Sequence, residues 1–168
     1  MPINKYLAQY PPSVLKQVNE LVQQGKLADF LLKRHPKPHD ISNDECLRDY
    51  VLALKNQYMK KSSALSKVIY DSKLQLVHNA LGLHSYVSRV QGSKLKSKNE
   101  IRVATVFKGV SADFLNMIVV HELAHLKEKE HNKAFYRLCE HMLPAYHQLE
   151  FEMRLYLIQL ELSGSIYS

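Results

Sequence analysis

The sequence predicts an α+β fold in which a small, mostly antiparallel sheet is packed by helices. Apolar residues recur with helical spacing through the first third of the chain and again after residue 111. Between these parts, short runs rich in β-branched and aromatic residues alternate with turn residues, which is typical of strands. A group of strands flanked by helices favours the α+β class. With 168 residues, the chain (1–168) is expected to form a single domain with a sizeable core.

Composition restricts the class of protein further. Hydrophobic residues make up 46% of the chain, which argues against disorder, and no apolar run approaches the roughly 18–20 residues of a membrane helix. The first residues lack the apolar segment of a signal peptide, and Cys46 and Cys139 lack metal-like spacing. We therefore expect a cytoplasmic protein with reduced thiols. A net charge of +7 bears on partners, and an acidic substrate, nucleic acid or simple solubility could each account for it.

The first 62 residues are expected to be helical. Ser13 is a plausible N-cap for a first helix, and a second helical piece carries the apolar residues of Leu27–Leu31 as far as the proline-broken stretch His35–Pro38. Ser42–Glu45 has the form of a capping box and predicts the start of another helix. The segment Lys60–Ser63 is the best internal linker, and it separates this helical part (1–62) from a part with the sheet and the metal-site helices (63–168).

Strand patterns follow this linker. Val68–Val77 predicts a hairpin around the turn residues Asp71–Lys73, and Ser85–Val90 predicts a further strand. Gly92–Glu100 is expected to be a polar loop rich in lysine. Ile101–Phe107 predicts one more strand, which leads within a few residues into a helix. A last helix is expected from Pro144 to about Gly164.

The helix after the last strand carries the segment His121-Glu122-Leu123-Ala124-His125. Ser111 is a plausible N-cap, and Asp113 places a negative charge in the first turn, where it suits the helix dipole. From Phe114 onward the helix is apolar nearly all round, which indicates a buried helix. Two histidines and a glutamate would be costly to desolvate there unless something binds them. A metal ion is the most economical explanation, and the alternative is a solvated charge cluster where Lys127–Glu130 makes the helix end polar.

The spacing of these residues matches the H-E-x-x-H arrangement of zinc hydrolases. His121 and His125 are four residues apart, so they lie on one helix face and can offer two imidazole nitrogens to one ion. Glu122, the next residue, can act on a metal-bound water as general base without being a ligand. Zinc is therefore the expected cofactor.

A third ligand is expected at His131. Six residues after His125, His131 can reach the metal only if the helix ends between Glu128 and Glu130. Asn132 would then cap a new helix. Three histidines with one open position make a catalytic rather than a structural zinc site. The alternative third ligand is a carboxylate from a later helix, namely one of Glu140, Glu150 and Glu152.

The segments Ile101–Val103, Val119–Leu126 and His131–Tyr136 closely resemble the YgjP-like metal-dependent hydrolases. These are zincin-type proteins related to the WLM and SprT metallopeptidase groups. The resemblance implies a zincin-like fold, with zinc held by His121, His125 and His131 and with Glu122 as the catalytic residue. Members are commonly described as peptidases, and some as pyrophosphatases acting on nucleoside triphosphates such as UTP. The chain departs from many members at Arg89–Ser93, where the Trp and Cys of their Arg-Trp-Gly-Ser-Cys turn are missing.

Three functions are compatible with these observations. The leading interpretation is a zinc-dependent, metallopeptidase-like hydrolase whose peptide substrate could lie extended along Ile101–Phe107. The first alternative is a nucleoside triphosphate pyrophosphatase with the same metal site, whose phosphates a basic cluster before the metal helix would position. That cluster consists of Arg89, Lys94, Lys96, Lys98 and Arg102. The second alternative is a non-catalytic, zinc-stapled basic module that binds nucleic acid. Tyr146 and His147 could reach an oxyanion if their helix folds over the site.

Overall fold

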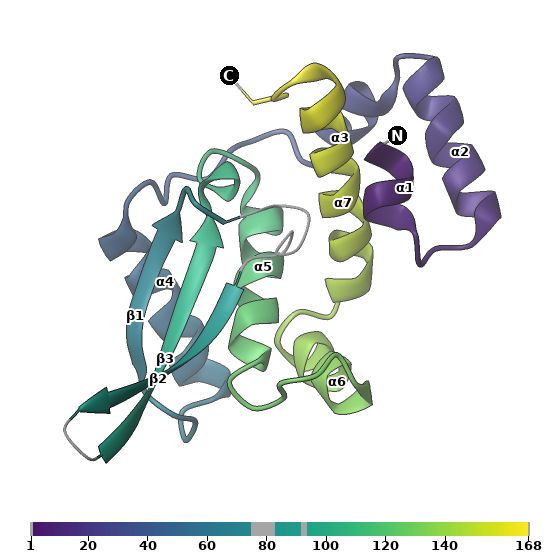
Figure 1. Ribbon diagram of the computed structural model, residues 1–168. Coiled ribbons are helices and arrows are strands. Elements are labelled where there is room, and N and C mark those ends of the chain that lie inside the picture. Colours follow the sequence, from purple (N-terminus) through teal and green to yellow (C-terminus); the bar gives the residue numbers. More distant parts are fainter. Residues whose placement is uncertain (1, 75–82, 92–93, 168) are drawn as a thin grey trace.

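The computed structural model describes residues 2–74, 83–91 and 94–167, with side-chain detail for residues 2–74 and 99–167 (Figure 1). The elements in chain order are α1 (Pro2–Leu7), α2 (Pro12–Gln23), α3 (Leu27–Arg34), α4 (Asp44–Tyr58), β1 (Leu65–Asp71), β2 (Leu83–Gln91), β3 (Lys94–Ala104), the 3-10 turn η1 (Thr105–Phe107), α5 (Ala112–Ala124), α6 (Lys133–Met142) and α7 (Tyr146–Ser163). The expected α+β class is confirmed. In the described part of the chain, no helix is long and apolar enough to span a bilayer.

The sheet has three strands in the order β1-β3-β2, and it is mixed rather than mostly antiparallel. β1 runs parallel to β3, with Val68 opposite Ile101, whereas β2 runs antiparallel to β3, with His84 opposite Ile101. The sequence predicted that β1 would form a hairpin with the residues after Asp71–Lys73. β1 pairs instead with β3, a strand much later in the chain. The second arm of the predicted hairpin falls largely on residues 75–77, which lie outside the described residues.

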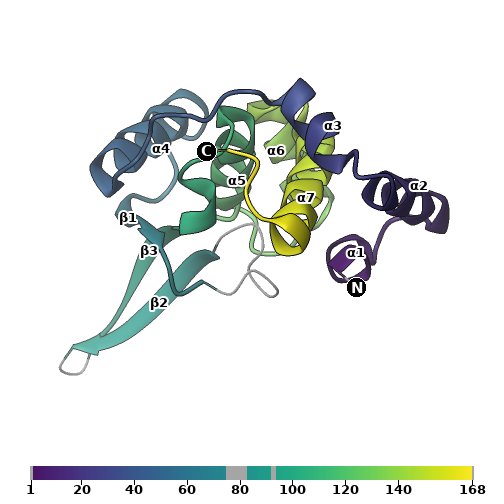
Figure 2. The same ribbon diagram turned by 90° about the horizontal axis from the view of Figure 1, so that it is seen from above.

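Two further expectations about β3 were wrong. Residues 94–100 are not a loop but the first part of this strand, since they pair residue by residue with β2. Figure 2 shows that this end of the β2–β3 ribbon projects beyond the helices, so no core face imposes an apolar alternation on it. The strand predicted for Ile101–Phe107 ends at Ala104, and β3 lies between β1 and β2. Ile101 and Arg102 are paired on both sides and therefore offer no edge to an extended peptide.

The helix α5 lies between the sheet and α7, while α4 covers β1 (Figures 1 and 2). Side chains are buried at almost every position from Phe114 to Ala124, so the prediction of a buried helix is confirmed. The Ser111 hydroxyl accepts a hydrogen bond from the Asp113 N–H at 3.2 Å, as expected of an N-cap. A helix buried on all sides cannot shift or rotate without repacking the core. It is a rigid base for the side chains at its end.

The N-terminal third is helical, as predicted, but two of its helix starts differ from the prediction. α2 begins at Pro12, so Ser13 is inside the helix and Pro11 occupies the cap. Proline at the first helical position has the right φ and no N–H to satisfy, which favours this start. α4 is capped by Asn43, whose side chain accepts a hydrogen bond from the Cys46 N–H at 2.8 Å, and not by Ser42.

Candidate metal centre

The end of α5 presents the first two histidines. The helix ends at Ala124, before the predicted range of Glu128 to Glu130, and His125 is its C-cap. The chain then winds tightly, because the Lys127 N–H bonds the Ala124 carbonyl at 3.1 Å. α6 begins after Asn132, whose side chain accepts a hydrogen bond from the Phe135 N–H at 2.9 Å. As the sequence predicts, His131 is left in a turn between two helices and is free to fold back.

The three histidines meet at their Nε2 atoms. Nε2 of His125 lies 3.2 Å from Nε2 of His121 and 3.0 Å from Nε2 of His131. One ligand atom from each residue falls within 4.8 Å of the others. Two nitrogen ligands of a tetrahedral zinc ion, each about 2.0–2.1 Å from the metal, are about 3.3 Å apart. The spacing of the Nε2 atoms therefore fits a zinc ion bound by three imidazoles.

The other ring nitrogens of the two helical histidines already have partners. Nδ1 of His121 lies 2.7 Å from the Tyr146 hydroxyl, and Nδ1 of His125 lies 2.9 Å from the Glu128 carbonyl oxygen. A carbonyl oxygen only accepts, so His125 carries its proton on Nδ1, and its Nε2 lone pair faces the other two histidines, where it can bind a metal. The Tyr146 hydroxyl also contacts the Cys139 thiol, so it can accept from His121 while donating to sulfur.

Burial favours the neutral form of His121 and His125. It lowers the pKa of His121 well below its ordinary value of 6.5, and the neighbouring His125 and His131 lower it further. Burial is also the largest cause of the lowered pKa of His125. Neutral imidazole is the form that binds a metal, because the charged form has no lone pair to give. His121 and His125 are therefore ready to bind a metal at neutral pH.

Glu122 is the group that could act on a water. Its side chain is 1% exposed, and burial raises its pKa well above the ordinary value of 4.5. Among the described residues, its Oε2 atom has no hydrogen-bond partner. A buried carboxylate oxygen without a partner is costly, and a water held between it and a metal would satisfy it. Glu122 therefore fits a catalytic zinc site as well as the histidines do.

Phe135 packs the three imidazoles into one arrangement. Its ring centroid lies 5.0, 4.6 and 4.9 Å from those of His121, His125 and His131, respectively. Phe135 is fully buried, and the Asn132 cap fixes its place in the first turn of α6. Phe135, four positions after His131, thus packs against all three histidine rings.

The alternative third ligands lie apart from this cluster. Glu140 pairs with His147 at 2.6 Å and Glu150 with Arg154 at 3.2 Å, while Glu152 contacts Arg34 and His35. In the described part of the chain, none of the three carboxylates joins the group of histidines that could hold a metal. His147 faces Glu140, so the suggestion that it reaches an oxyanion has no support in the geometry.

The basic cluster predicted for phosphates is only partly described. Side chains of Arg89, Lys94, Lys96 and Lys98 lie outside the residues with side-chain detail. Arg102 forms ion pairs with Asp71 at 2.9 Å and with Glu100 at 3.0 Å, so its positive charge is paired with carboxylates of the sheet. These contacts raise the pKa of Arg102, with the hydrogen bond to Asp71 as the largest cause. Arg102 therefore acts as a structural residue here.

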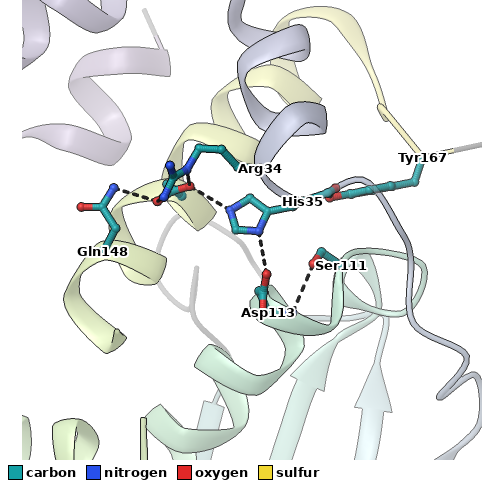
Figure 3. Close-up of polar contacts among 7 residues, drawn as sticks. Arg34, His35, Ser111, Asp113, Gln148 and Tyr167 are labelled. Atoms are coloured by element: carbon teal, nitrogen blue, oxygen red, sulfur yellow. Dashed lines mark hydrogen bonds and ion pairs between the residues drawn. The ribbon is translucent and has the colours of Figure 1, made fainter. Parts of the chain in front are cut away.

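A second polar cluster fixes α5 and α7 from the other end, and the sequence did not reveal it. In Figure 3 the His35 ring lies beside Asp113 of α5, and its other nitrogen contacts Glu152 of α7. The distances are 2.9 Å to Asp113 and 2.8 Å to Glu152. Arg34 and Gln148 also bond Glu152. Burial raises the pKa of Glu152, but the hydrogen bonds and the Arg34 charge outweigh it, and the pKa lies below its ordinary value.

Sequence reasoning also missed the role of Tyr146 as the partner of His121. Twenty-five positions separate the two residues, and no spacing rule links the start of one helix to the middle of another. The only available signal was the expectation that a buried histidine ligand needs a partner for its second nitrogen.

Comparison with known proteins identifies the family of this chain. A family model described as "YgjP-like, metallopeptidase domain" matches residues 33–156. A protein of Escherichia coli (strain K12) named "UTP pyrophosphatase" is 58% identical over 157 residues, which cover 94% of each chain. No solved structure matches. The family match spans most of the chain and includes every residue of the histidine cluster, so the resemblance seen in the sequence is confirmed, and the chain belongs to the YgjP-like family of hydrolase enzymes.

Proposed function

We propose that this chain is a zinc-dependent nucleoside triphosphate pyrophosphatase that acts on UTP or a close analogue. The observation that carries the hydrolytic part is the meeting of three Nε2 atoms beside the buried carboxylate of Glu122. The substrate class is supported by the relative that is 58% identical over nearly its whole length and is named a UTP pyrophosphatase. The reaction adds water across the bond between the α- and β-phosphates, so that UTP and water give UMP and pyrophosphate.

His121, His125 and His131 would hold the zinc ion through Nε2. When bound, zinc supplies a Lewis acid that lowers the pKa of a water and draws charge from phosphoryl oxygens. Glu122 accepts one proton of the attacking water at its carboxylate, and the remaining hydroxyl forms the new bond to the α-phosphorus. The bond from that phosphorus to the bridging oxygen breaks, and pyrophosphate leaves with the electron pair. Glu122 then returns its proton to the leaving group or to solvent.

The test is product analysis with zinc-loaded protein. Phosphorus NMR of a UTP reaction should show UMP and pyrophosphate as the first products, with activity lost after chelation and restored by added zinc. UDP and inorganic phosphate as the products would contradict the proposed bond. No turnover of any nucleoside triphosphate by fully zinc-loaded protein would contradict the proposed substrate class.

A peptidase is a second candidate because the matching family model is described as a metallopeptidase domain. The expected docking strand is central, but the outer side of β2 is unpaired in the part of the chain that the structure describes. An extended peptide could add to that side through main-chain hydrogen bonds. A quenched-fluorescence peptide library, incubated with wild-type and Glu122→Gln protein, tests this. Glu122-dependent cleavage together with intact UTP would make the peptidase the better assignment.

A further inference from the structure

We propose that a basic groove beside the metal centre binds the β- and γ-phosphates of the nucleoside triphosphate; this inference rests on the proposed function. The groove runs between the end of α4 and the turn that follows α5, and its volume is about 560 Å³. That volume is within the range of small-molecule sites, roughly 300–1,000 Å³. Its basic residues are Lys60 and Lys61 on one wall and Lys127 on the other.

The lysines of this groove are available to a ligand. Lys60, Lys61 and Lys127 are exposed, and within the described side chains none of them forms an ion pair. The groove has no Asp or Glu in its lining, whereas the hydroxyl of Ser63 adds a hydrogen-bond donor. Three positive charges and one hydroxyl donor without an opposing carboxylate suit a polyanion. Phosphate oxygens are the matching chemistry.

The Lys60–Lys61 wall is already in place before a ligand binds. α4 ends at Tyr58, and the buried Met59 anchors the following turn in the core. The Ser62 N–H and hydroxyl bond the Met59 carbonyl at 3.0 and 2.6 Å, and Lys55 bonds the Ser62 carbonyl at 3.3 Å. A turn held by its own hydrogen bonds loses little backbone entropy on binding. The segment Lys60–Ser63, which the sequence suggested was a linker, is therefore a fixed wall of the groove.

The opposite wall belongs to the metal centre itself. Lys127 lies two residues after His125 in the tight turn whose Glu128 carbonyl orients that histidine. Leu126 and Lys127 line the groove, while His125 faces His121 and His131. In the proposed binding mode, the α-phosphate lies at the metal and the β- and γ-phosphates extend past this turn into the groove. This placement would let the site distinguish a triphosphate from a monophosphate.

The test is binding of a UTP analogue in which a methylene group replaces the oxygen between the α- and β-phosphates. The groove variant changes Lys60, Lys61 and Lys127 together to Ser. Exposed charge contacts are individually weak, so three of them should raise the Kd of the analogue, and the KM for UTP, by roughly tenfold. Added salt should weaken binding by the wild type more than binding by the variant, because exposed charges are screened.

A matched control changes Lys16, Lys26 and Lys33 together to Ser. These lysines are also exposed but lie on α2 and α3 or between them, and the net charge falls by the same amount. The control should bind the analogue as the wild type does. Equal loss in both variants would show a general charge effect and would overturn the groove, as would unchanged binding by the groove variant. Circular dichroism and zinc content check that both variants are folded and loaded.

Failure of the groove and failure of the proposed function give different results. Pyrophosphate release by the wild type with equal kinetics in the groove variant and the control would sustain the function and overturn the groove. Analogue binding that depends on Lys60, Lys61 and Lys127, without any hydrolysis of UTP, would sustain the groove and overturn the function. A titration with oligouridine separates a nucleotide site from a nucleic-acid surface. Groove-dependent binding of the oligomer more tightly than the analogue would overturn the assignment to a triphosphate.

Discussion

Changing Tyr146 to Phe should weaken zinc binding without unfolding the protein. The change removes only the hydroxyl, whose oxygen lies 2.7 Å from Nδ1 of His121. Tyr146 is fully buried and His121 is 5% exposed, so bulk water has little access to the orphaned nitrogen. Burial raises the pKa of Tyr146, so the wild-type side chain is a neutral phenol that can accept from Nδ1.

The size of the expected loss in zinc affinity follows from the tautomer of His121. Zinc on Nε2 fixes the proton on Nδ1, whereas the metal-free ring can choose the tautomer that suits its surroundings. The cost of an unsatisfied buried N–H, about 1–3 kcal/mol, therefore falls mainly on the metal-bound state. Because 1.4 kcal/mol is a factor of ten, zinc affinity should fall by roughly 5- to 150-fold. This range agrees with the loss of about 10- to 100-fold in metal affinity that is typical when a metal ligand loses its hydrogen-bond partner.

The assay is a zinc competition titration against a chromophoric chelator. Tyr136→Phe is the control, because Tyr136 is a second tyrosine beside the cluster, half-buried, with its ring centroid 6.4 Å from that of His131. The control should keep wild-type affinity. Wild-type zinc affinity in Tyr146→Phe would refute the idea that the Tyr146 hydroxyl orients His121. An equal loss in both variants would instead indicate a packing effect.

Three further predictions concern the metal, the base and the pH dependence of stability. His131→Ala should lose zinc on dialysis against a mild chelator, since only two protein ligands remain; wild-type metal content would remove His131 from the site. Glu122→Gln should keep zinc and fold but lose UTP hydrolysis by about 10²–10⁴-fold, because an amide cannot take the proton; retained turnover would exclude Glu122 as the base. The pKa of Glu152 in the fold lies below its ordinary value of 4.5, so its carboxylate stabilises the fold at neutral pH, and this stabilisation is lost as the pH falls through the folded pKa. Glu152→Gln should therefore be less stable by about 1–3 kcal/mol at pH 7, and the gap in Tm should close in acid; a gap that stays constant with pH would contradict this.

The sequence predicted the metal helix well because its signals are local. The spacing of His121 and His125, the Ser111 cap and the Asn132 cap each depend on residues within one or two helical turns. His131 was placed by the same reasoning, since a helix that continued would have turned it away from the other two. The exact end of the helix was wrong by a few residues, and this did not alter the meeting of the histidines.

The misassigned features depend on long-range contacts. β3 was expected to be a strand with an open edge, but its two neighbours come from separate parts of the chain, one parallel and one antiparallel. No local pattern encodes which strand will lie in the centre of a sheet. Lysines at Lys94–Lys98 suggested a loop, and cross-strand pairing with β2 overrode that preference. The role of Tyr146 as the partner of His121 depends on the packing of α7 against α5, which no local pattern predicts.

The His35 cluster determines where this chain can be divided. His35 and Arg34 belong to the helical N-terminal third by sequence, yet their side chains hold the buried Glu152 of α7 and the first turn of α5. A truncation at residue 62 would leave Glu152 buried without Arg34 and His35, and the start of α7 carries Tyr146. We therefore expect the sheet and metal-site helices not to fold alone. The match to the family model begins at residue 33, so it includes Arg34 and His35 together with the three histidines of the candidate metal centre.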